Sequence, residues 1–293
     1  MMSWLERIIS MYLLICDEYK KNLWVYCQRF TNYADLSFSD EEVMTIYLFA
    51  TMEGRTTKKQ MYEHAKNYWS DLFPCLPSYV AFVKRVNRLA DVFPVFIEHL
   101  QAMLPQHLLS KTHYRLIDSM PIILAQRGRR FHAKVAAEIA DKNGYCATKK
   151  LYYYGVKLHV MGSAQPKTLP IPDKIGITGA GMSDLKAYEA ILPEVICYEK
   201  FADKAYISES TKFTQTYTPV KKQKGQEFLD AADQLYSTAI SRIRQPIESC
   251  FNWIEEKVKI QMASKVRSYN GLMVHIFGKL TVVFNLLLSK FSC

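Results

Sequence analysis

The stretch Leu151-Tyr-Tyr-Tyr-Gly-Val-Lys-Leu-His-Val-Met161 is the strongest β-strand signal in the chain. Aromatic and β-branched residues dominate it, and such side chains favour the extended backbone of a sheet. Weaker strand signals lie at residues 114–118, 174–178, 199–205 and 217–220, and a helix is expected at 184–192. Three strands, a helix, two further strands and a late helical region predict a mixed sheet flanked by helices, with elements of both the α+β and the α/β class.

The segment 1–110 shows helical periodicity and no convincing strand alternation, so we expect an all-helical N-terminal domain. Ser39, followed three residues later by Glu42, forms a capping-box pattern that opens one helix. Thr56 or Thr57 can cap the next helix in the same way. The sequence therefore predicts a pair of helices joined by a short turn.

This helix pair, with Gly54 in its turn, resembles a helix-turn-helix. Its second helix is surrounded by basic residues that suit a phosphate backbone, namely Arg55, Lys58, Lys59 and Lys66. Capped helix pairs are also common in helical domains that bind no DNA, so DNA binding and dimerisation both stay open for this region. Pro105 and the polar residues after it mark a boundary. We expect a helical domain at 1–110 and a second domain at 111–293.

The composition describes a folded, basic protein of 293 residues with a formal net charge of +10. Hydrophobic residues make up 49% and no low-complexity tract interrupts them, which is typical of a globular chain. The positive charge favours nucleic acid or an anionic membrane surface as a partner. The seven cysteines lack zinc-ligand spacing, and the apolar runs at 8–15 and 280–288 are too short to span a bilayer. We expect a cytoplasmic protein with reduced thiols and no membrane partner.

Much of the positive charge lies between residues 111 and 160, where ten basic and three acidic residues leave a charge of +7 (10 − 3). A basic insertion is predicted at 121–150, directly after a strand-like segment that ends in an acid. A run of this kind either forms a solvated loop or binds phosphate. Because it adjoins that acid, we expect it to bind phosphate.

Three acidic residues lie where a carboxylate needs an explanation. Asp118 follows the apolar pair Leu116-Ile117, and Asp203 follows Phe201-Ala202. A carboxylate in an apolar strand is costly without a partner or a cation. The third acid, Glu248, lies on a late helix. Taken singly, each also fits a turn, a helix cap or a surface ion pair, so the residues alone leave the assignment open.

Glu248 has the clearest helical setting of the three acids. Apolar residues recur around it at steps of four, four, three and four, and they form one stripe for the core: Ile243, Ile247, Phe251, Ile254 and Val258. Arg244 precedes Glu248 by one helical turn and can orient its carboxylate. Pro246 is expected in the first turn of this helix or at a kink, because it has no N–H to donate.

Carboxylates without neighbouring Cys or His ligands suit magnesium better than zinc, because magnesium prefers oxygen ligands. Two such ions can align an attacking oxygen with a phosphorus atom and neutralise the charge that develops there. Acids of this kind on a basic chain therefore indicate metal-dependent phosphodiester chemistry.

Five blocks in this order resemble the DDE transposases of bacterial insertion sequences. They are Leu116-Ile-Asp-Ser-Met-Pro-Ile122, Gly144-Tyr-Cys-Ala-Thr-Lys-Lys150, Tyr152-Tyr-Tyr-Gly-Val-Lys-Leu-His159, Ala202-Asp-Lys-Ala-Tyr206 and Arg244-Gln-Pro-Ile-Glu-Ser-Cys-Phe251. The similarity covers most of the chain and implies a ribonuclease-H-like catalytic domain. It implies that Asp118, Asp203 and Glu248 are metal-binding catalytic acids.

The resemblance also implies a cofactor and partners. Two magnesium ions are expected, with manganese as a substitute, and the substrates are double-stranded terminal inverted repeats and target DNA. A homodimer or a higher homo-oligomer, associated with the nucleoid of the bacterial cytoplasm, would bring two element ends together. The expected DNA contacts are Arg127, Arg129, Arg130, Lys134, Lys149, Lys150, Lys157 and Arg244.

The chain departs from the family pattern at two places near Glu248. Ser241 and Glu255 stand where relatives often carry Tyr and Lys, and Lys257 lies two residues after the second position. The accessory DNA contacts of the family are therefore not carried over. Two alternatives stay open beside a transposase: a related nuclease that cleaves without joining strands, and a DNA-binding protein that has lost the chemistry.

Overall fold

A computed structural model describes residues 3–29, 36–105, 114–164, 168–191, 199–207 and 215–291. The chain forms two compact units: Met1–Leu104 together with Glu256–Cys293, and Pro105–Glu255. We call them the helical unit and the sheet unit. This division differs from the predicted one, because the C-terminal segment Glu256–Cys293 groups with the N-terminal helices. The predicted boundary at 110/111 lies outside the described residues.

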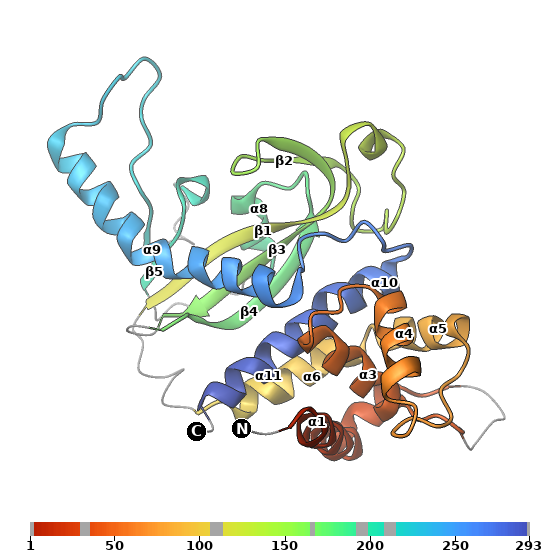
Figure 1. The fold of residues 1–293 in the computed structure, drawn as a ribbon. Helices are drawn as coiled ribbons and strands as arrows, with labels where there is room; N and C mark the ends of the chain where they lie inside the picture. The colour runs from red at the N-terminus through yellow and green to blue at the C-terminus, as the bar shows by residue number, and fades with distance from the viewer. Residues whose placement is uncertain are drawn as a thin grey trace. The chain divides into compact units, whose positions relative to one another are not determined.

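The helical unit is built from helices that come from both ends of the chain (Figure 1). They are α1 (Trp4–Glu18), α2 (Trp24–Tyr26), α3 (Asp40–Met52), α4 (Lys58–Tyr68), α5 (Tyr79–Arg88), α6 (Val92–Met103), α10 (Tyr269–Met273) and α11 (Lys279–Phe291). π-helical turns at Tyr19–Leu23 and Val274–Gly278 continue α1 into α2 and α10 into α11.

The C-terminal helix α11 lies in the core of the helical unit, against α6 and α3. Val282, Val283 and Phe284 are fully buried, and the Tyr47 hydroxyl donates a hydrogen bond of 3.0 Å to the carbonyl of Val274. The segment Tyr269–Lys290 is long and apolar enough to cross a membrane, and 72% of its most apolar window is buried inside the protein. The apolar run noted in the sequence at 280–288 is only part of this segment, because α10, the π-helical turn and α11 form one continuous helical segment.

The capping signals of the N-terminal helices are confirmed. Ser39 and Glu42 form a reciprocal capping box at the start of α3, and Thr57 and Gln60 form one at the start of α4. Gly54 has a φ of +82° in the turn between these helices, a conformation that costs glycine little. Burial of the Lys58 ammonium lowers its pKa to about 8. Its Nζ donates to Asn87 Oδ1, so this lysine is turned toward the protein.

The described strands of the sheet unit form a mixed sheet of six strands. They are β1 (Tyr114–Gln126), β2 (Asn143–Cys146), β3 (Leu151–Ser163), β4 (Ile171–Gly179), β5 (Glu199–Phe201) and β6 (Thr216–Tyr217). The long strands β1, β3 and β4 can be followed in Figure 1. β3 pairs antiparallel with β1, β2 and β4, whereas β5 pairs parallel with both β1 and β6. The predicted mixed sheet flanked by helices is confirmed at this level. The short strand β2 was not predicted.

The first strand is longer than the sequence indicated, because it runs through Pro121 to Gln126. Asp118 therefore lies inside β1 instead of ending it, and the start of the predicted basic insertion at 121–150 belongs to the strand. A proline is tolerated where one side of a strand makes no ladder hydrogen bonds. Along β1, the parallel neighbour β5 pairs only with residues 114–116, so the described structure leaves that side of Pro121 without a partner strand.

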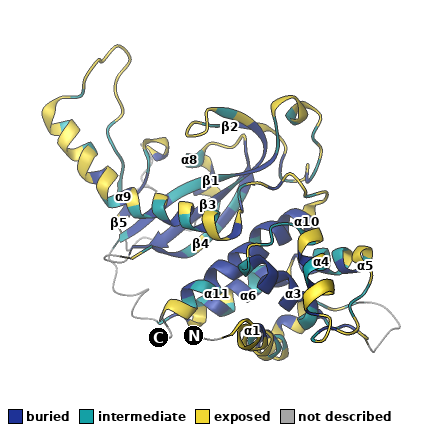
Figure 2. Ribbon diagram, in the orientation of Figure 1, coloured by how far each residue is buried: buried dark blue, intermediate teal, exposed yellow. Residues whose placement is uncertain are grey.

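Among the described residues of this unit, the helices α8 (Asp184–Ile191) and α9 (Ala231–Val258) accompany the sheet. Tyr188 of α8 packs in a cluster with Ile117 and Met161, which belong to β1 and β3. Figure 2 shows that the strands β1, β3 and β4 are largely buried, whereas the first part of α9 is largely exposed. The second part of α9 carries the predicted apolar stripe, in which Ile247, Phe251, Ile254 and Val258 are buried.

Pro246 lies in the interior of α9 and not in its first turn. It has no N–H to donate to the carbonyl of residue 242, and the ring crowds that turn, which bends a helix. The ribbon of α9 changes direction along its length (Figure 1). Of the two predicted placements, a first turn or a kink, the structure therefore has the second.

Candidate functional site

Pairing of β1 with β5 brings Asp118 and Asp203 to corresponding positions. Leu116 lies beside Phe201 in this parallel pair, and each aspartate follows its member of the pair by two positions along the chain. Parallel neighbouring strands place residues of equal register side by side. Asp203 itself lies just beyond β5, where it caps the 3₁₀ turn Lys204–Tyr206 and accepts a 2.8 Å hydrogen bond from the Lys204 N–H.

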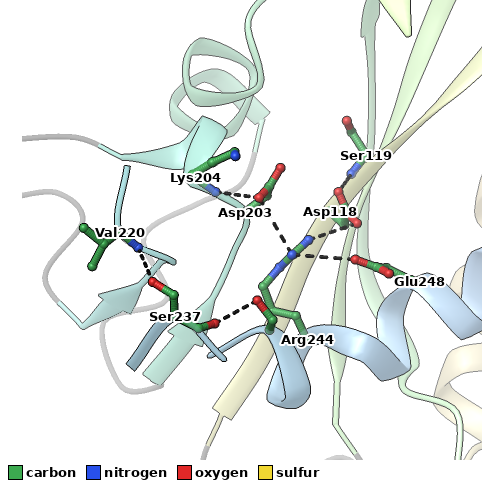
Figure 3. Close-up of polar contacts among 9 residues, drawn as sticks. Asp118, Ser119, Asp203, Lys204, Val220, Ser237, Arg244 and Glu248 are labelled. Atoms are coloured by element: carbon green, nitrogen blue, oxygen red, sulfur yellow. Dashed lines mark hydrogen bonds and ion pairs between the residues drawn. The ribbon is translucent and has the colours of Figure 1, made fainter. Parts of the chain in front are cut away.

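Arg244 joins these two aspartates to Glu248 (Figure 3). Its Nη2 lies 3.2 Å from Asp118 Oδ2, and its Nη1 lies 3.9 Å from Asp203 Oδ1 and 3.7 Å from Glu248 Oε1. The Arg244 side chain is only 7% exposed, while the carboxylates become more exposed in the order Asp118, Asp203, Glu248. One buried guanidinium therefore holds three carboxylates that come from β1, the segment after β5, and α9.

The pKa of Asp118 is shifted by its surroundings. Burial raises its pKa to about 7, while Arg244 and the Ser119 N–H, which donates a 2.8 Å hydrogen bond to Oδ1, act in the opposite direction. The negative charges of Asp203 and Glu248 add to the increase. Three acids beside one arginine carry a net charge of −2 when all are ionised (1 − 3), so the cluster favours a further cation.

The donor chemistry of this cluster fits magnesium, but the side chains are not gathered as metal ligands. Carboxylate oxygens are the ligands that magnesium prefers. Within the described ranges, no group of three or more His, Cys, Asp or Glu side chains lies close enough together to hold a metal ion. The three carboxylates lie instead around the guanidinium of Arg244, and this ion-paired arrangement sets their spacing.

The predicted DNA contacts around the basic insertion lie on the surface of the sheet unit. Arg127, Arg129 and Arg130 form the 3₁₀ turn Arg127–Phe131 that follows β1, and the first two are exposed. Lys134 is exposed in the next loop, and Lys149 and Lys150 are exposed in the turn between β2 and β3. These basic residues come after Gln126, the end of β1 that is farther from Asp118. The basic surface is therefore separate from the acidic cluster, to which Arg244 belongs.

The ammonium group of Lys157, another predicted DNA contact, is held by the protein. It lies 3.1 Å from Asp184 Oδ1 and donates a 2.9 Å hydrogen bond to the carbonyl of Met182. The same Asp184 oxygen accepts a 2.9 Å hydrogen bond from Ser119 Oγ, next to Asp118. Lys157 therefore supports the strand that carries Asp118 instead of presenting a free charge to phosphate.

Ser119 and Asp184 were not singled out from the sequence as parts of the site. They are 65 residues apart, and no spacing rule connects them. Asp184 alone has the pattern of a residue in the first turn of a helix, which is where it lies in α8. Only the sheet, which brings β1, β3 and α8 together, makes the connection visible.

The comparisons with known proteins assign the chain to no family. Comparison of the chain with protein-family models, with curated proteins and with solved structures gave no match.

Proposed function

We propose that the chain is a DDE transposase, which cleaves DNA at the ends of a mobile element and transfers the strands into target DNA. One observation carries this proposal: Asp118, Asp203 and Glu248 come together around one buried arginine. These acids lie far apart in the sequence, on three separate elements. Surface ion pairs do not require acids from three elements, so a shared function accounts for their arrangement better than three unrelated structural roles.

The sheet supports a ribonuclease-H-like assignment for the sheet unit. Its long strands β1, β3 and β4 are antiparallel, and β5 and β6 continue the sheet in parallel from β1. Asp118 is on the strand where the two arrangements meet, and Asp203 follows the adjacent parallel strand. Ligand and catalytic groups commonly lie beyond the carboxyl ends of parallel strands.

The residues of the site would divide the work as follows. Asp118, Asp203 and Glu248 would hold magnesium, with manganese as a substitute, after leaving their ion-paired positions around Arg244. When bound, magnesium supplies positive charge at the reacting phosphate and lowers the pKa of an attacking water. Arg244 keeps the three carboxylates near one another and limits their repulsion. The Ser119 N–H and the buried strand fix the orientation of Asp118.

The proposed substrate is double-stranded DNA, and the basic surface provides the charge to bind it. Exposed Arg127, Arg129, Lys149 and Lys150 would contact phosphates without reading the sequence. Joining two element ends in one reaction requires at least two copies of the active site, so we propose a homodimer or a larger homo-oligomer as the working form.

Cleavage of the element ends by the purified full chain tests this function. The wild type is expected to nick a labelled terminal repeat with its flanking DNA when magnesium or manganese is present, and not in EDTA. Asp118→Asn, Asp203→Asn and Glu248→Gln should each reduce the cleavage rate by about 100- to 1,000-fold, as expected when charge stabilisation at phosphorus is lost. Glu256→Gln is the matched control, because Glu256 is an exposed acid on the same helix, 2.9 Å from Lys257. Full cleavage by all three site variants would sink the proposal.

A DNA-binding protein without cleavage activity is the second candidate, and the position of Arg244 favours it. The guanidinium already neutralises part of the charge of the acids, so the cluster can be stable without a metal ion. Binding of terminal repeats with no metal-dependent cleavage would support this candidate. Cleavage without a 3′-hydroxyl strand-transfer product on plasmid DNA would instead identify a nuclease.

A further inference from the structure

Three aromatic side chains are exposed together at the basic end of the sheet unit. Phe131 is 66% exposed, Tyr152 is 57% exposed and Tyr145 is 51% exposed. Tyr145 and Tyr152 are directly opposite each other on β2 and β3, with ring centroids 4.8 Å apart. We call these three residues, together with Arg130, the aromatic patch.

Arg130 connects the aromatic rings of the patch. Its guanidinium carbon lies 4.2 Å from the centroid of the Phe131 ring and 5.0 Å from that of the Tyr152 ring. The Nε of Arg130 is buried and has no hydrogen-bond partner in the described part of the chain. A planar cation between two rings makes a continuous stacking surface. Arg makes such contacts with aromatic rings more often than Lys does.

The rings of the patch lie outside the buried core of this hairpin. The core beneath this hairpin is made by other residues, because Tyr153, Ile123 and Ala180 are buried as a separate cluster. Exposed basic residues flank the patch on two sides. Arg127 and Arg129 precede Phe131 in the turn after β1, and Lys149 and Lys150 lie in the turn that joins β2 to β3. The turn residues Arg127 and Lys150 adopt positive φ values of 54° and 49°, which are uncommon for residues with a Cβ.

We propose that the aromatic patch stacks against unpaired bases of DNA while the surrounding arginines and lysines hold the phosphates. This inference rests on the proposed function and adds the state of the DNA that the protein binds. Base stacking on aromatic rings combined with a positive surface is the general mode of single-strand binding. Paired bases lie inside the duplex and cannot reach such rings, so the patch requires opened or single-stranded DNA.

The position of the patch predicts where the DNA is opened. Asp118 lies eight positions before Gln126, the end of β1 (126 − 118), and the patch begins shortly after that end. A strand rises about 3.3 Å per residue, so the patch lies roughly 26 Å along the sheet from the acids. DNA that follows β1 covers this distance with about seven or eight nucleotides, at roughly 3.4 Å per nucleotide of one strand.

Equilibrium binding of the full-length chain to fluorescent DNA tests the proposal. The probes are a 20-nucleotide oligo(dT) and a fully paired 20-base-pair duplex, each measured by fluorescence anisotropy in EDTA. The double variant Phe131→Leu/Tyr152→Leu keeps apolar bulk and charge but removes two rings. It should bind oligo(dT) about 10- to 100-fold more weakly and change duplex binding less than about threefold.

Phe228→Leu is the matched control, because Phe228 is 74% exposed in the same unit and also lies near a cation, 5.7 Å from Lys222 Nζ. It should bind both probes like the wild type. Circular dichroism and the thermal midpoint show whether each variant is folded. If the double variant is unfolded, Phe131→Tyr/Tyr152→Phe, which keeps both rings, and the single Tyr145→Leu variant replace it. The first should bind oligo(dT) like the wild type and the second at least about threefold more weakly.

The outcomes separate this proposal from the proposed function. Equal losses on both probes, or no loss on either, would overturn the stacking role, and tighter binding of oligo(U) than of oligo(dT) would overturn the assignment to DNA. Asp118→Asn should bind oligo(dT) like the wild type. If the wild type binds oligo(dT) through the patch but never cleaves, the transposase proposal fails and the patch stands. If it cleaves but the ring variants bind normally, only the patch fails.

Discussion

Asp118 and Asp203 occupy equivalent positions relative to two neighbouring parallel strands, because each lies two positions after its member of the Leu116–Phe201 pair. Sheet hydrogen bonds therefore set the distance between these acids, and the long segment between them can vary without changing it. Glu248 has no such support, since it depends on the position of α9. Arg244, one turn before it on the same helix, connects that helix to both aspartates.

Replacement of Arg244 should reveal the repulsion between the acids. In EDTA, Arg244→Ala is expected to lower the free energy of unfolding by about 1–3 kcal/mol, because it leaves a partly buried carboxylate without its partner. Magnesium at millimolar concentration should restore part of this loss, and Arg244→Lys should lose less than Arg244→Ala. Urea unfolding with and without magnesium measures both effects.

Arg242→Ala is the control for this experiment, because Arg242 is exposed on the same helix. It should change the unfolding free energy by less than about 0.5 kcal/mol, the usual range for a surface residue. If Arg242→Ala and Arg244→Ala lose equal stability, the guanidinium of Arg244 does not hold the acids together.

The raised pKa of Asp118 predicts a dependence of stability on pH. Its pKa is about 7 in the folded chain and 3.8 without the surrounding protein, so the folded state binds the proton more tightly. The stabilisation from this proton is complete below pH 4 and is lost as the pH rises through 7. Relative to the wild type, Asp118→Asn should therefore gain about 2–4 kcal/mol in unfolding free energy between pH 4 and pH 8.

Urea unfolding of both proteins in EDTA across this pH range measures the difference, in which the titration of most other groups cancels. Asp173→Asn is not a suitable control, because burial also raises the pKa of Asp173. Glu256→Gln serves better, since its carboxylate is exposed and paired with Lys257. A pH-independent difference between Asp118→Asn and the wild type would contradict the raised pKa.

The salt dependence of duplex binding should depend on the exposed basic residues. Each phosphate contact contributes about −0.9 to the slope of log K against log salt concentration. Combined replacement of Arg127, Arg129, Lys149 and Lys150 by Gln should make this slope less steep by about 2–3, since some contacts are incomplete. Lys157→Gln should leave the slope unchanged, because its ammonium group is held by Asp184. If the slope changed only in Lys157→Gln, Lys157 and not the four exposed residues would be the phosphate contact.

Gly155 should be intolerant of a side chain. It lies on β3, and a Cβ at this position would collide with the carbonyl oxygen of Ile122, next to the irregularity between Ile123 and Ala125 on β1. Gly155→Ala should therefore destabilise the protein by about 2–4 kcal/mol, as overpacking against backbone does. Gly128→Ala, where a Cβ would meet open space, should be nearly neutral. Midpoints of urea unfolding compare the two.

Local signals predicted the parts of the fold that depend on neighbouring residues. The capping boxes at Ser39 and Thr57, the strand around 151–161 and the apolar stripe of α9 all follow from spacing within one element. The length of β1 could not be predicted, because Pro121 is tolerated only where no partner strand needs its N–H. The sequence does not show which side of a strand remains unpaired.

The sequence indicated the three acids of the candidate site, but not the long-range contacts that hold them in place. Arg244 was placed beside Glu248 by helical spacing, whereas its contact with Asp118 spans 126 residues and requires the folded sheet. Lys157 was expected to bind DNA because it is basic and lies near other basic residues, but its partner Asp184 lies on a helix 27 residues away. Charge along the chain shows where cations are, and only tertiary structure shows which are already paired.

The return of α11 to the helical unit has a consequence for synthesis. Domains usually fold in the order in which they leave the ribosome. Here α3 and α6 emerge early but lack the helix that covers them, since α11 spans Lys279–Phe291. The sheet unit is translated in the interval. The first unit to begin is therefore the last to be completed, and nascent chains interrupted after the sheet unit would expose the apolar surface that α11 normally covers.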